Sequence, residues 1–350
     1  MNCKSDKLKN FQKYLKAQKT AAFVVTDLES VNFLSDFEFL YEGDASLLIT
    51  PNKAFCFAKQ MYLGDLARHT PYLTLIENNT IINIVGKLKD LKIKQAFFDP
   101  TKMDYINGNL LHSAGVKEKP AFLLNAREIK TPDEIKKISK ACKISSAAYD
   151  IFRKKIKTGM TEIQAAKMLE DIMASLGGVG LAFDTIMAFG ENGANPHHRN
   201  TNRKLKAEEP VLLDYGCKVG GYCSDITRTF WHGKKPTAEF TKVFNMVKTA
   251  HDLAIKAARI GISGGALDAV CRDYLEEQTG RTDLFIHSTG HGLGWFIHEM
   301  PRIAKGEKGK LQADMTFTIE PGLYYQGRLG IRYENSVHLT KNSLKILTKK

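Results

Sequence analysis

The sequence contains five side chains that can bind metal ions, spaced so that two β-hairpins would bring them together. They are four carboxylates and one imidazole: Asp214, Asp225, His291, Glu320 and Glu334. Oxygen-rich sets of this kind favour hard divalent cations such as Mn(II) or Co(II) over a structural zinc ion held by sulfur. A fold that uses all of them must therefore contain two ribbons that converge on one centre.

The first pair lies on a predicted hairpin. Asp214 ends an apolar run at residues 211–213, and Asp225 follows a turn at Gly220-Gly221. A hairpin that turns at these glycines would set the two carboxylates opposite each other. An isolated Asp beside a turn is usually solvated or caps the turn, so the metal interpretation depends on the whole set.

The second pair repeats this arrangement further along the chain. Glu320 follows the strand-like residues 315–319, and Glu334 follows residues 330–333. A turn around Gly327 would bring these two glutamates level across a second hairpin. His291 lies between the hairpins in a glycine-rich segment, which lets the backbone pass close to a crowded centre.

Length and composition indicate a soluble globular protein of two domains. The chain has 350 residues, of which 43% are hydrophobic. Its six cysteines are scattered without a CxxC pair, which suggests free thiols in a reducing compartment. The first residues are polar and no segment approaches the length of a membrane span, so a cytoplasmic location without membrane partners is predicted.

The formal net charge of +13 raises the question of nucleic-acid binding. The lysines are dispersed, however, and those between residues 130 and 140 are expected on the solvated face of a helix. A solvated basic surface accounts for this pattern better than a nucleic-acid partner does.

The chain is predicted to divide near residue 126. Residues 1–126 alternate strand-like segments, at 21–26, 46–50 and 95–99, with helical ones, which is typical of a small α/β domain. Residues 127–350 form the second domain. There, residues 131–134 combine a capping box with Pro132 and predict a long helix to Lys157, and a second cap at Thr161 predicts a helix that ends near residue 177.

Seven motifs, in order, resemble those of the pita-bread metallopeptidases, the superfamily of methionine aminopeptidase, aminopeptidase P, prolidase and creatinase. The motifs are NPHH at 195–198, LDYG at 213–216, SDITRT at 224–229, TGHGLG at 289–294, HEMP at 298–301, IEPG at 319–322 and GIRYE at 330–334. The resemblance implies an α/β (α+β) protein, with a creatinase-like N-terminal domain at 1–126 and a pita-bread catalytic domain at 127–350.

The resemblance also implies a role for each ligand. Asp214 and Asp225 would hold one ion, and His291 and Glu320 would hold the other. Asp225 and Glu334 would bridge the two ions. Glu320 would in addition carry a proton from the attacking water towards the leaving nitrogen.

Four further residues match the family outside the ligand set. His197 and His298 resemble histidines that stabilise the tetrahedral oxyanion and position the scissile peptide, and the interval to the first ligand assigns this place to His197, not to His198. His287 and Arg332 resemble substrate-binding residues of the proline-specific branch, because methionine aminopeptidases generally carry other residues there.

The implied activity is that of an Xaa-Pro aminopeptidase with two divalent ions, predicted to be Mn(II), and with peptides that carry proline at the second position as substrates. The resemblance of the leading domain implies a homodimer. Two alternatives stay open: an Xaa-Pro dipeptidase (prolidase), and a catalytically silent scaffold that binds protein or nucleic acid. The complete ligand set argues against the silent scaffold.

Overall fold

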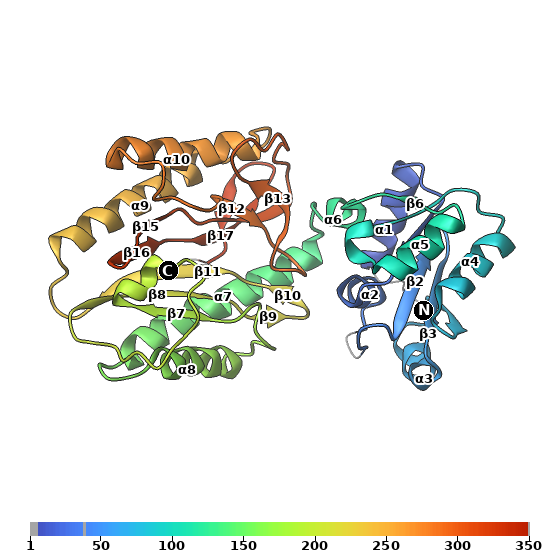
Figure 1. Ribbon diagram of the computed structural model, residues 1–350, viewed down its shortest axis with the longest axis horizontal. Helices are drawn as coiled ribbons and strands as arrows, with labels where there is room; N and C mark the ends of the chain where they lie inside the picture. Colours follow the sequence, from blue (N-terminus) through green and yellow to red (C-terminus); the bar gives the residue numbers. More distant parts are fainter. Residues whose placement is uncertain (1–5, 38–39, 349–350) are drawn as a thin grey trace. The chain divides into compact units, whose positions relative to one another are not determined.

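The computed structural model describes residues 6–37 and 40–348. The chain forms two compact units, Met1–Ala126 and Arg127–Lys350 (Figure 1). Within the described ranges, no helix is both long and apolar enough to cross a membrane. The five cysteines that lie in these ranges are free and buried, whereas Cys3 lies outside them.

The first unit is built on a six-stranded mixed sheet with the order β4-β3-β2-β1-β5-β6. Its strands are β1 (Ala22–Val25), β2 (Ala45–Ile49), β3 (Ala54–Ala58), β4 (Thr74–Glu77), β5 (Ala96–Phe98) and β6 (Lys117–Glu118). The residues of β1, β2 and β3 are all buried, because strands in the middle of a sheet are covered on both faces. The three strands predicted in this region are confirmed.

Helices follow most of these strands, as in an α/β arrangement. They are α1 (Asp6–Ala17), α2 (Leu28–Ser35), α3 (Gln60–His69), α4 (Ile81–Asp90), α5 (Tyr105–Ser113) and α6 (Phe122–Ala126), with a 3-10 turn η1 (Pro100–Lys102). Several begin at a side chain that caps the first turn: Thr80 accepts a hydrogen bond from Asn83 N at the start of α4.

The second unit contains two pairs of helices around several short antiparallel sheets. Its helices are α7 (Pro132–Lys155), α8 (Glu162–Ser175), α9 (Ala238–Ala257) and α10 (Gly264–Thr279), with a 3-10 turn η2 (Gly190–Ala194). Its first strands are β7 (Ile186–Phe189), β8 (Glu209–Tyr215), β9 (Lys218–Val219), β10 (Tyr222–Cys223) and β11 (Ile226–His232). Its later strands are β12 (Gly290–Gly292), β13 (Glu299–Ile303), β14 (Met315–Ile319), β15 (Gly322–Tyr325), β16 (Leu329–Arg332), β17 (Asn335–Leu339) and β18 (Leu344–Ile346).

Both predicted capping boxes are present. Thr131 starts α7 with Glu134 as its reciprocal partner, and Thr161 starts α8 with Gln164. The helix α7 ends at Lys155, two residues earlier than expected. Lys130 corrects another expectation: it precedes the helix and its side chain is buried, not solvated.

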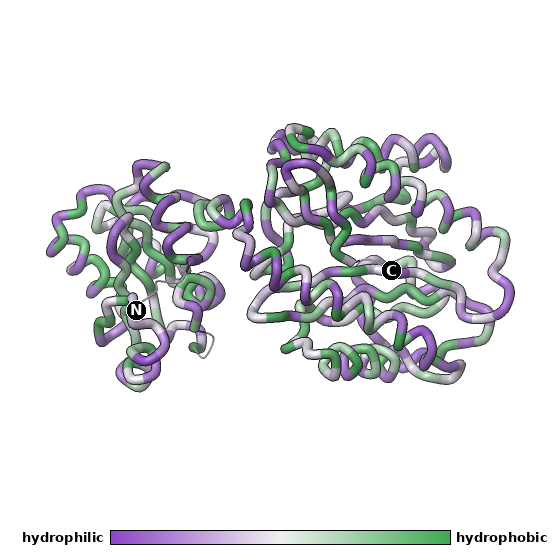
Figure 2. The backbone as a smooth tube through the Cα atoms, turned by 180° about the vertical axis from the view of Figure 1, so that it is seen from behind, coloured by the Kyte–Doolittle hydropathy of each residue, from purple (hydrophilic) through white to green (hydrophobic). Residues whose placement is uncertain are grey.

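Each helix pair covers its own part of the sheet structure, as Figure 1 shows for α7 and α8 on one side and α9 and α10 on the other. The first pair packs with the sheet β11-β8-β7, and the second pair packs with the sheet β13-β12-β14-β17-β18. Hydrophilic and hydrophobic residues alternate along these helices (Figure 2), because each helix buries one face only. The ends of the strands between the two helix layers are where the predicted ligands lie.

Candidate metal centre

The first ribbon of the centre is formed by β8 and β11. Asp214 in β8 pairs with Thr227 of β11, so the register differs from the expected direct pairing of Asp214 with Asp225. Asp225 lies immediately before β11, where the chain leaves the short β9–β10 tip. The two carboxylates still converge, because they and Glu334 offer oxygen atoms that all lie within 4.8 Å of one another.

The second ribbon brings two glutamates to the same place. The last pair between β14 and β17 is Ile319 with Asn335, so Glu320 and Glu334 follow at the same level, as predicted. The hairpin β15–β16 closes this ribbon through a turn in which Gly327 has a φ of +67°. Glu334 is 1% exposed, which places its carboxylate inside the unit.

Two glycines allow this close approach of backbones. A Cβ atom on Gly216 would lie 1.9 Å from the carbonyl oxygen of Ser224, and one on Gly290 would lie 2.0 Å from that of Thr318. Because no side chain fits into such gaps, glycine is required at both positions.

His291 joins the two ribbons. Its Nε2 lies 3.3 Å from Glu320 Oε1 and 3.5 Å from Asp225 Oδ2. Thr318 supports the pair, because its hydroxyl accepts a hydrogen bond from His291 N and donates one to Glu320 Oε1, each 3.0 Å long. All five predicted ligands therefore lie in one connected cluster.

Burial and mutual repulsion dominate the electrostatics of this cluster. Burial, together with the charge of neighbouring carboxylates, raises the pKa of Asp225 and of Glu334 well above their ordinary values. Burial also raises the pKa of Asp214, against the opposing charge of Arg332. For Glu320, burial is outweighed by the hydrogen bond and charge of His291, which lower its pKa to about 2.

Two buried carboxylate oxygens accept no hydrogen bond from any residue in the described ranges. They are Asp214 Oδ1 and Glu334 Oε1. Buried polar atoms are nearly always satisfied, and a buried carboxylate without a cation is costly. Divalent cations bound between these residues would supply the missing partners and relieve the repulsion, so the side chains present fit a metal centre.

Arg332 connects the cluster to the residues beside it. Its Nη2 donates to Asp214 Oδ2 at 2.5 Å, and its Nε donates to the hydroxyl of Thr227 at 3.0 Å. The Thr227 hydroxyl in turn donates to Glu334 Oε2 at 2.6 Å. Arg332 is 2% exposed, so from inside the protein it orients one predicted ligand, Asp214, directly and another, Glu334, through Thr227.

Tyr324 links Arg332 to His287. Its hydroxyl accepts from Arg332 Nη1 at 2.8 Å and lies 2.7 Å from His287 Nε2. The other ring nitrogen of His287 lies 2.8 Å from the carbonyl oxygen of Ser288 and must carry the proton, so the Tyr324 hydroxyl donates to Nε2. Burial lowers the pKa of His287 to about 4, which agrees with this neutral ring.

Replacing Tyr324 with Phe is expected to lower kcat/KM for a peptide substrate by about 10- to 100-fold, because Arg332 and His287 each lose a buried partner. Steady-state kinetics measures this effect. Tyr325→Phe is the matched control, because the neighbouring ring lies under Arg328, whereas the contact with His287 Nε2 is made by the Tyr324 hydroxyl. Equal activities of the two variants would contradict the proposed link.

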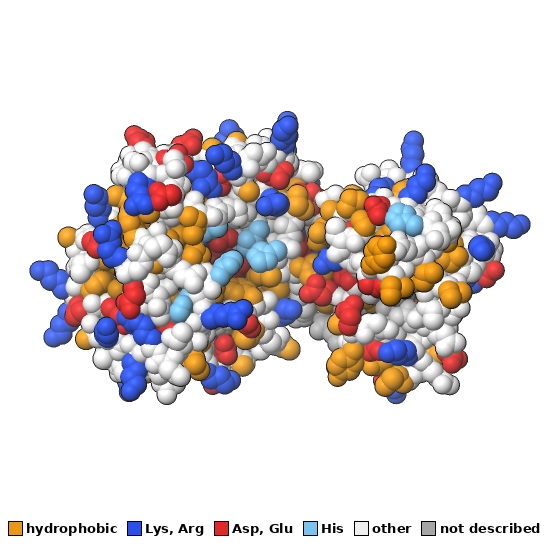
Figure 3. Space-filling model, viewed as in Figure 1, with side chains coloured by type: hydrophobic (Ala, Val, Ile, Leu, Met, Phe, Trp, Pro, Cys, Tyr) orange, Lys and Arg blue, Asp and Glu red, His pale blue; other side chains and the backbone are white. Residues whose placement is uncertain are grey.

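His298 and His197 are both exposed. The ring of His298 packs 4.4 Å from that of His291, centroid to centroid. Partial desolvation and the nearby His291 lower the pKa of His298, so the ring is neutral at pH 7. His197 is exposed, whereas Nε2 of its neighbour His198 lies within hydrogen-bonding distance of Glu162 Oε2, at 2.8 Å. Figure 3 shows histidine side chains gathered beside acidic ones on this face of the second unit.

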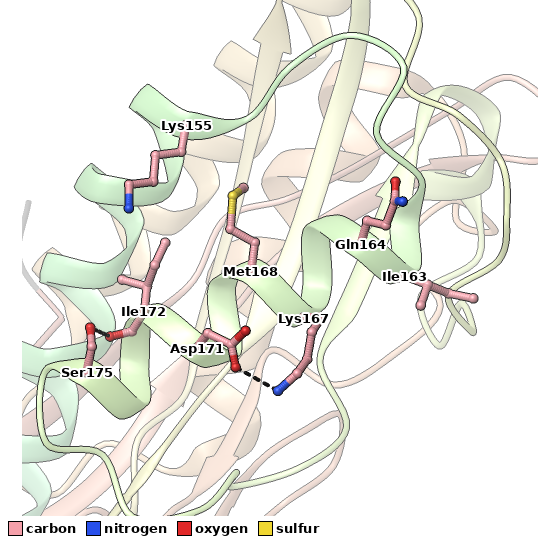
Figure 4. A pocket seen from close by; sticks show the side chains of 8 residues that line it. All are labelled: Lys155, Ile163, Gln164, Lys167, Met168, Asp171, Ile172 and Ser175. Carbon is pink, nitrogen blue, oxygen red and sulfur yellow. Dashed lines mark hydrogen bonds and ion pairs between the residues drawn. The ribbon is translucent and has the colours of Figure 1, made fainter.

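A separate hollow lies along α8 and contains none of the predicted site residues (Figure 4). It is lined by Lys155, Ile163, Gln164, Lys167, Met168, Asp171, Ile172 and Ser175. Two oppositely charged side chains of this lining, Lys167 and Asp171, form an ion pair with an N–O distance of 2.6 Å. The chemistry therefore belongs to the cluster of carboxylates and histidines and not to this hollow.

Sequence comparisons agree with these observations. Residues 136–341 match the model of metallopeptidase family M24, and residues 7–115 match that of the creatinase/prolidase N-terminal domain. A putative Xaa-Pro aminopeptidase of Mycoplasma genitalium is 33% identical over 96% of this chain and 94% of its own length. One of Mycoplasma pneumoniae is 42% identical, over 61% of this chain and 62% of its own length. An Xaa-Pro dipeptidase of Pyrococcus furiosus is 31% identical over 89% and 86%.

Solved structures show the same fold across the whole chain. An X-Pro aminopeptidase from Thermotoga maritima has a TM-score of 0.89 and 30% identity, covering 98% of this chain and 97% of that one. An Xaa-Pro dipeptidase from Bacillus anthracis has a TM-score of 0.90 and 27% identity, with 99% and 97% covered. The predicted α/β fold and its resemblance to the pita-bread enzymes are confirmed, and the chain belongs to metallopeptidase family M24.

Proposed function

We propose that the chain is a two-metal exopeptidase that removes the first residue from peptides with proline at the second position. The observation that carries the proposal is the convergence of three buried carboxylates, two of them with an oxygen that lacks a hydrogen-bond partner, beside the His291–Glu320 pair. The relatives named Xaa-Pro aminopeptidase and Xaa-Pro dipeptidase support the choice of substrate.

The five ligands would divide between two ions. Asp214 and Asp225 would hold one ion, His291 and Glu320 the other, and Asp225 and Glu334 would bridge them. The closeness of His291 to both Glu320 and Asp225 supports this division. Four carboxylates and one imidazole suit Mn(II), with Co(II) or another divalent ion as the alternative.

Two bound divalent ions supply Lewis acidity, which lowers the pKa of water and polarises a carbonyl group. Glu320 is the residue that accepts a proton from the attacking water and passes it to the leaving nitrogen. The carboxylate is held in place for this role by Thr318, which donates a hydrogen bond to it, and by His291, whose Nε2 lies 3.3 Å away. The nitrogen of proline leaves poorly without a proton, so cleavage requires this transfer.

The histidines act on the substrate. His298 is neutral and can donate a hydrogen bond to the oxyanion that develops at the scissile carbonyl, and exposed His197 can reach the same substrate group. Neutral His287 lies beside Tyr324 and Arg332, where it would contact the proline side of the peptide. These three roles follow the predicted assignments.

One assay tests the proposal. Protein loaded with Mn(II) is offered an Xaa-Pro dipeptide, an Xaa-Pro-Yaa tripeptide and Met-Ala-Ser, and products are identified by mass spectrometry. Cleavage of the tripeptide after its first residue is the expected result. Cleavage of the dipeptide alone would favour a prolidase activity, as in the name of the Pyrococcus furiosus relative, Xaa-Pro dipeptidase. Release of Met from Met-Ala-Ser would contradict proline specificity, and no turnover with any divalent ion would favour a silent scaffold.

Replacing His197 with Ala is expected to slow turnover by roughly 100- to 1000-fold, the effect typical of losing one donor to an oxyanion. Metal affinity, measured by isothermal titration calorimetry, should stay near that of the unmodified protein, since His197 is not among the clustered ligands. His112→Ala, an exposed histidine of the first unit, serves as the control. Loss of bound metal in the His197 variant would indicate a ligand role instead.

The proposal extends to the state of the protein in the cell. The free, buried cysteines of the described ranges support a reducing compartment such as the cytoplasm. A homodimer is proposed from the creatinase/prolidase N-terminal domain and is measured by light scattering of the purified protein. Peptides are the proposed partners. No nucleic-acid or membrane partner is proposed.

A further inference from the structure

Two buried carboxylates lie outside the ligand cluster and each contacts the chain next to a histidine of the site. Glu162 is the first residue of α8 and is 0% exposed, and Glu299 is the first residue of β13 and is 5% exposed. A buried carboxylate is retained only where several donors satisfy it. The donors to each of these two glutamates therefore indicate which segment of the chain that glutamate holds in place.

Glu162 holds together the loop that contains His197. Its carboxylate accepts hydrogen bonds from Phe189 N at 3.0 Å and from Asn192 Nδ2 at 2.8 Å, near the start of the loop. It also accepts from Thr201 N at 2.9 Å and from Thr201 Oγ1 at 2.7 Å, at the loop's other end. One carboxylate thus fixes both ends.

The same carboxylate reaches the residue beside His197. His198 Nε2 lies 2.8 Å from Glu162 Oε2, and the His198 side chain is 10% exposed. His197 is exposed. Because the two residues are adjacent, the anchor on His198 constrains the backbone from which the exposed His197 projects.

Glu299 holds the segment that contains His298. It accepts from Lys130 Nζ at 2.9 Å and from Phe296 N at 3.0 Å, and it forms an ion pair with Arg127, whose guanidinium lies over the Phe296 ring. The cations oppose the effect of burial and lower the pKa of Glu299, so the anchor is charged.

This segment is tightly built around the carboxylate. A Cβ atom on Gly294 would lie 2.6 Å from Glu299 Oε2, and Gly294 O accepts a hydrogen bond from Cys223 N at 2.7 Å. Glu299 is buried, whereas the preceding His298 is exposed and its ring lies against that of His291. Fixing the Glu299 carboxylate therefore fixes the backbone from which the His298 ring projects.

We infer that Glu162 and Glu299 are positioning residues, the first acting through His197 and the second through His298. The inference rests on the proposed function for what the two histidines do to a substrate, but the placement of each ring does not depend on catalysis. Each glutamate would set the geometry of one oxyanion donor from the side remote from the substrate.

The placement is tested on metal-free protein by NMR of histidine rings labelled with 15N and 13C. Ring signals are assigned with His197→Ala and His298→Ala. Because a Gln side chain carries an NH₂ group that cannot accept, Glu162→Gln should shift or broaden the signals of His197 and leave those of His298 unchanged, and Glu299→Gln should do the reverse. Unchanged signals from the paired histidine in either variant would overturn the inference for that glutamate.

Double-mutant cycles on the Mn(II)-loaded enzyme test the functional part. A displaced donor can slow turnover by up to about 100-fold, so each Glu→Gln change should lower kcat in the otherwise unmodified protein. In the background that lacks the paired histidine, the same change should have little further effect. The crossed pairs, Glu162→Gln with His298→Ala and Glu299→Gln with His197→Ala, are controls and should be additive. Additivity in the matched pairs would reject a positioning role.

Milder variants keep the test decisive if a Gln variant does not fold. Thr201→Val removes one donor from Glu162, and Lys130→Met removes one cation from Glu299, with Lys130→Arg as the conservative rescue. Circular dichroism establishes that each is folded. In each of these variants, the signals of the paired histidine alone should shift, by less than in the Gln variant, and the loss of kcat should again be non-additive with removal of that histidine. Unchanged signals together with additive losses would overturn the inference. Failure of the unmodified enzyme to cleave any Xaa-Pro peptide would reject the proposed function alone, because the NMR result still decides the placement.

Discussion

Replacing Glu320 with Ala is expected to lower the turnover of Xaa-Pro peptides by several orders of magnitude. The variant loses a proposed metal ligand, the proposed proton carrier and the hydrogen-bonding partner of His291 at once. The measurement is kcat at saturating peptide and saturating Mn(II), so that weaker binding of substrate or metal is not mistaken for slower turnover.

The comparison for this variant is Glu277→Ala, which removes an exposed glutamate of α10 and should leave turnover unchanged. Glu320→Gln separates the two roles of the carboxylate. An amide oxygen can still contact a cation but cannot carry a proton, so this variant should retain more metal than activity. Near-normal turnover of the Ala variant would show that another group moves the proton.

The second large effect concerns Asp225. Asp225→Asn is expected to abolish activity and the response of stability to Mn(II), yet to make the metal-free protein more stable than its unmodified parent. The amide removes a buried charge from a site where neighbouring carboxylates repel it. In the unmodified protein, each bound ion should add about 2.7 kcal/mol to the free energy of unfolding when it is present at a hundred times its Kd.

The same variant should flatten the pH dependence of the metal-free protein. The folded pKa values of Asp225 and Glu334 lie above their ordinary values of 3.8 and 4.5. The folded state therefore binds more protons than the unfolded state above about pH 4, and the free energy of unfolding falls as the pH rises through the folded pKa values.

Urea unfolding at pH 5 and pH 8 in the presence of a chelator measures this slope. The free energy of unfolding should fall less, or rise more, from pH 5 to pH 8 in Asp225→Asn than in the unmodified protein, because the buried neutral His287 contributes equally to both. A metal-free variant that is less stable than its parent at pH 8 would contradict the view that repulsion between these carboxylates is relieved by cations.

Local patterns accounted for much of the fold. The boxes at Thr131 and Thr161 predicted α7 and α8, because a capping box depends on residues three apart in the chain. The end of α7 was less well defined, since the helix stops at Lys155 without a strong local signal before Gly159. The pairing of Glu320 with Glu334 followed from a single hairpin and was also correct.

Contacts between distant residues could not be predicted in this way. Asp214 pairs with Thr227 and not directly with Asp225, because the β9–β10 tip between them sets the register of the ribbon. Lys130 was expected in solvent, but it lies against Glu299, 169 residues later in the chain. No local sequence pattern predicts an ion pair between residues so far apart in the chain.

The site shows the same division. The side chains proposed to bind metal ions stand out in the sequence, because Asp, Glu and His are common ligands. Tyr324 and Glu162, in contrast, look like ordinary residues of a strand and of a helix start. Tyr324 follows the IEPG motif closely, which was the only sequence signal for it. Its role depends on Arg332 and His287, which the fold brings to it from different strands and loops.

Anomalous X-ray diffraction from crystals loaded with Mn(II) tests the metal centre most directly. Data collected on either side of the Mn absorption edge should show two peaks about 3.5–4 Å apart, enclosed by Asp214, Asp225, His291, Glu320 and Glu334. A single peak, or peaks bound by other residues while these five keep their metal-free contacts, would contradict the two-metal account.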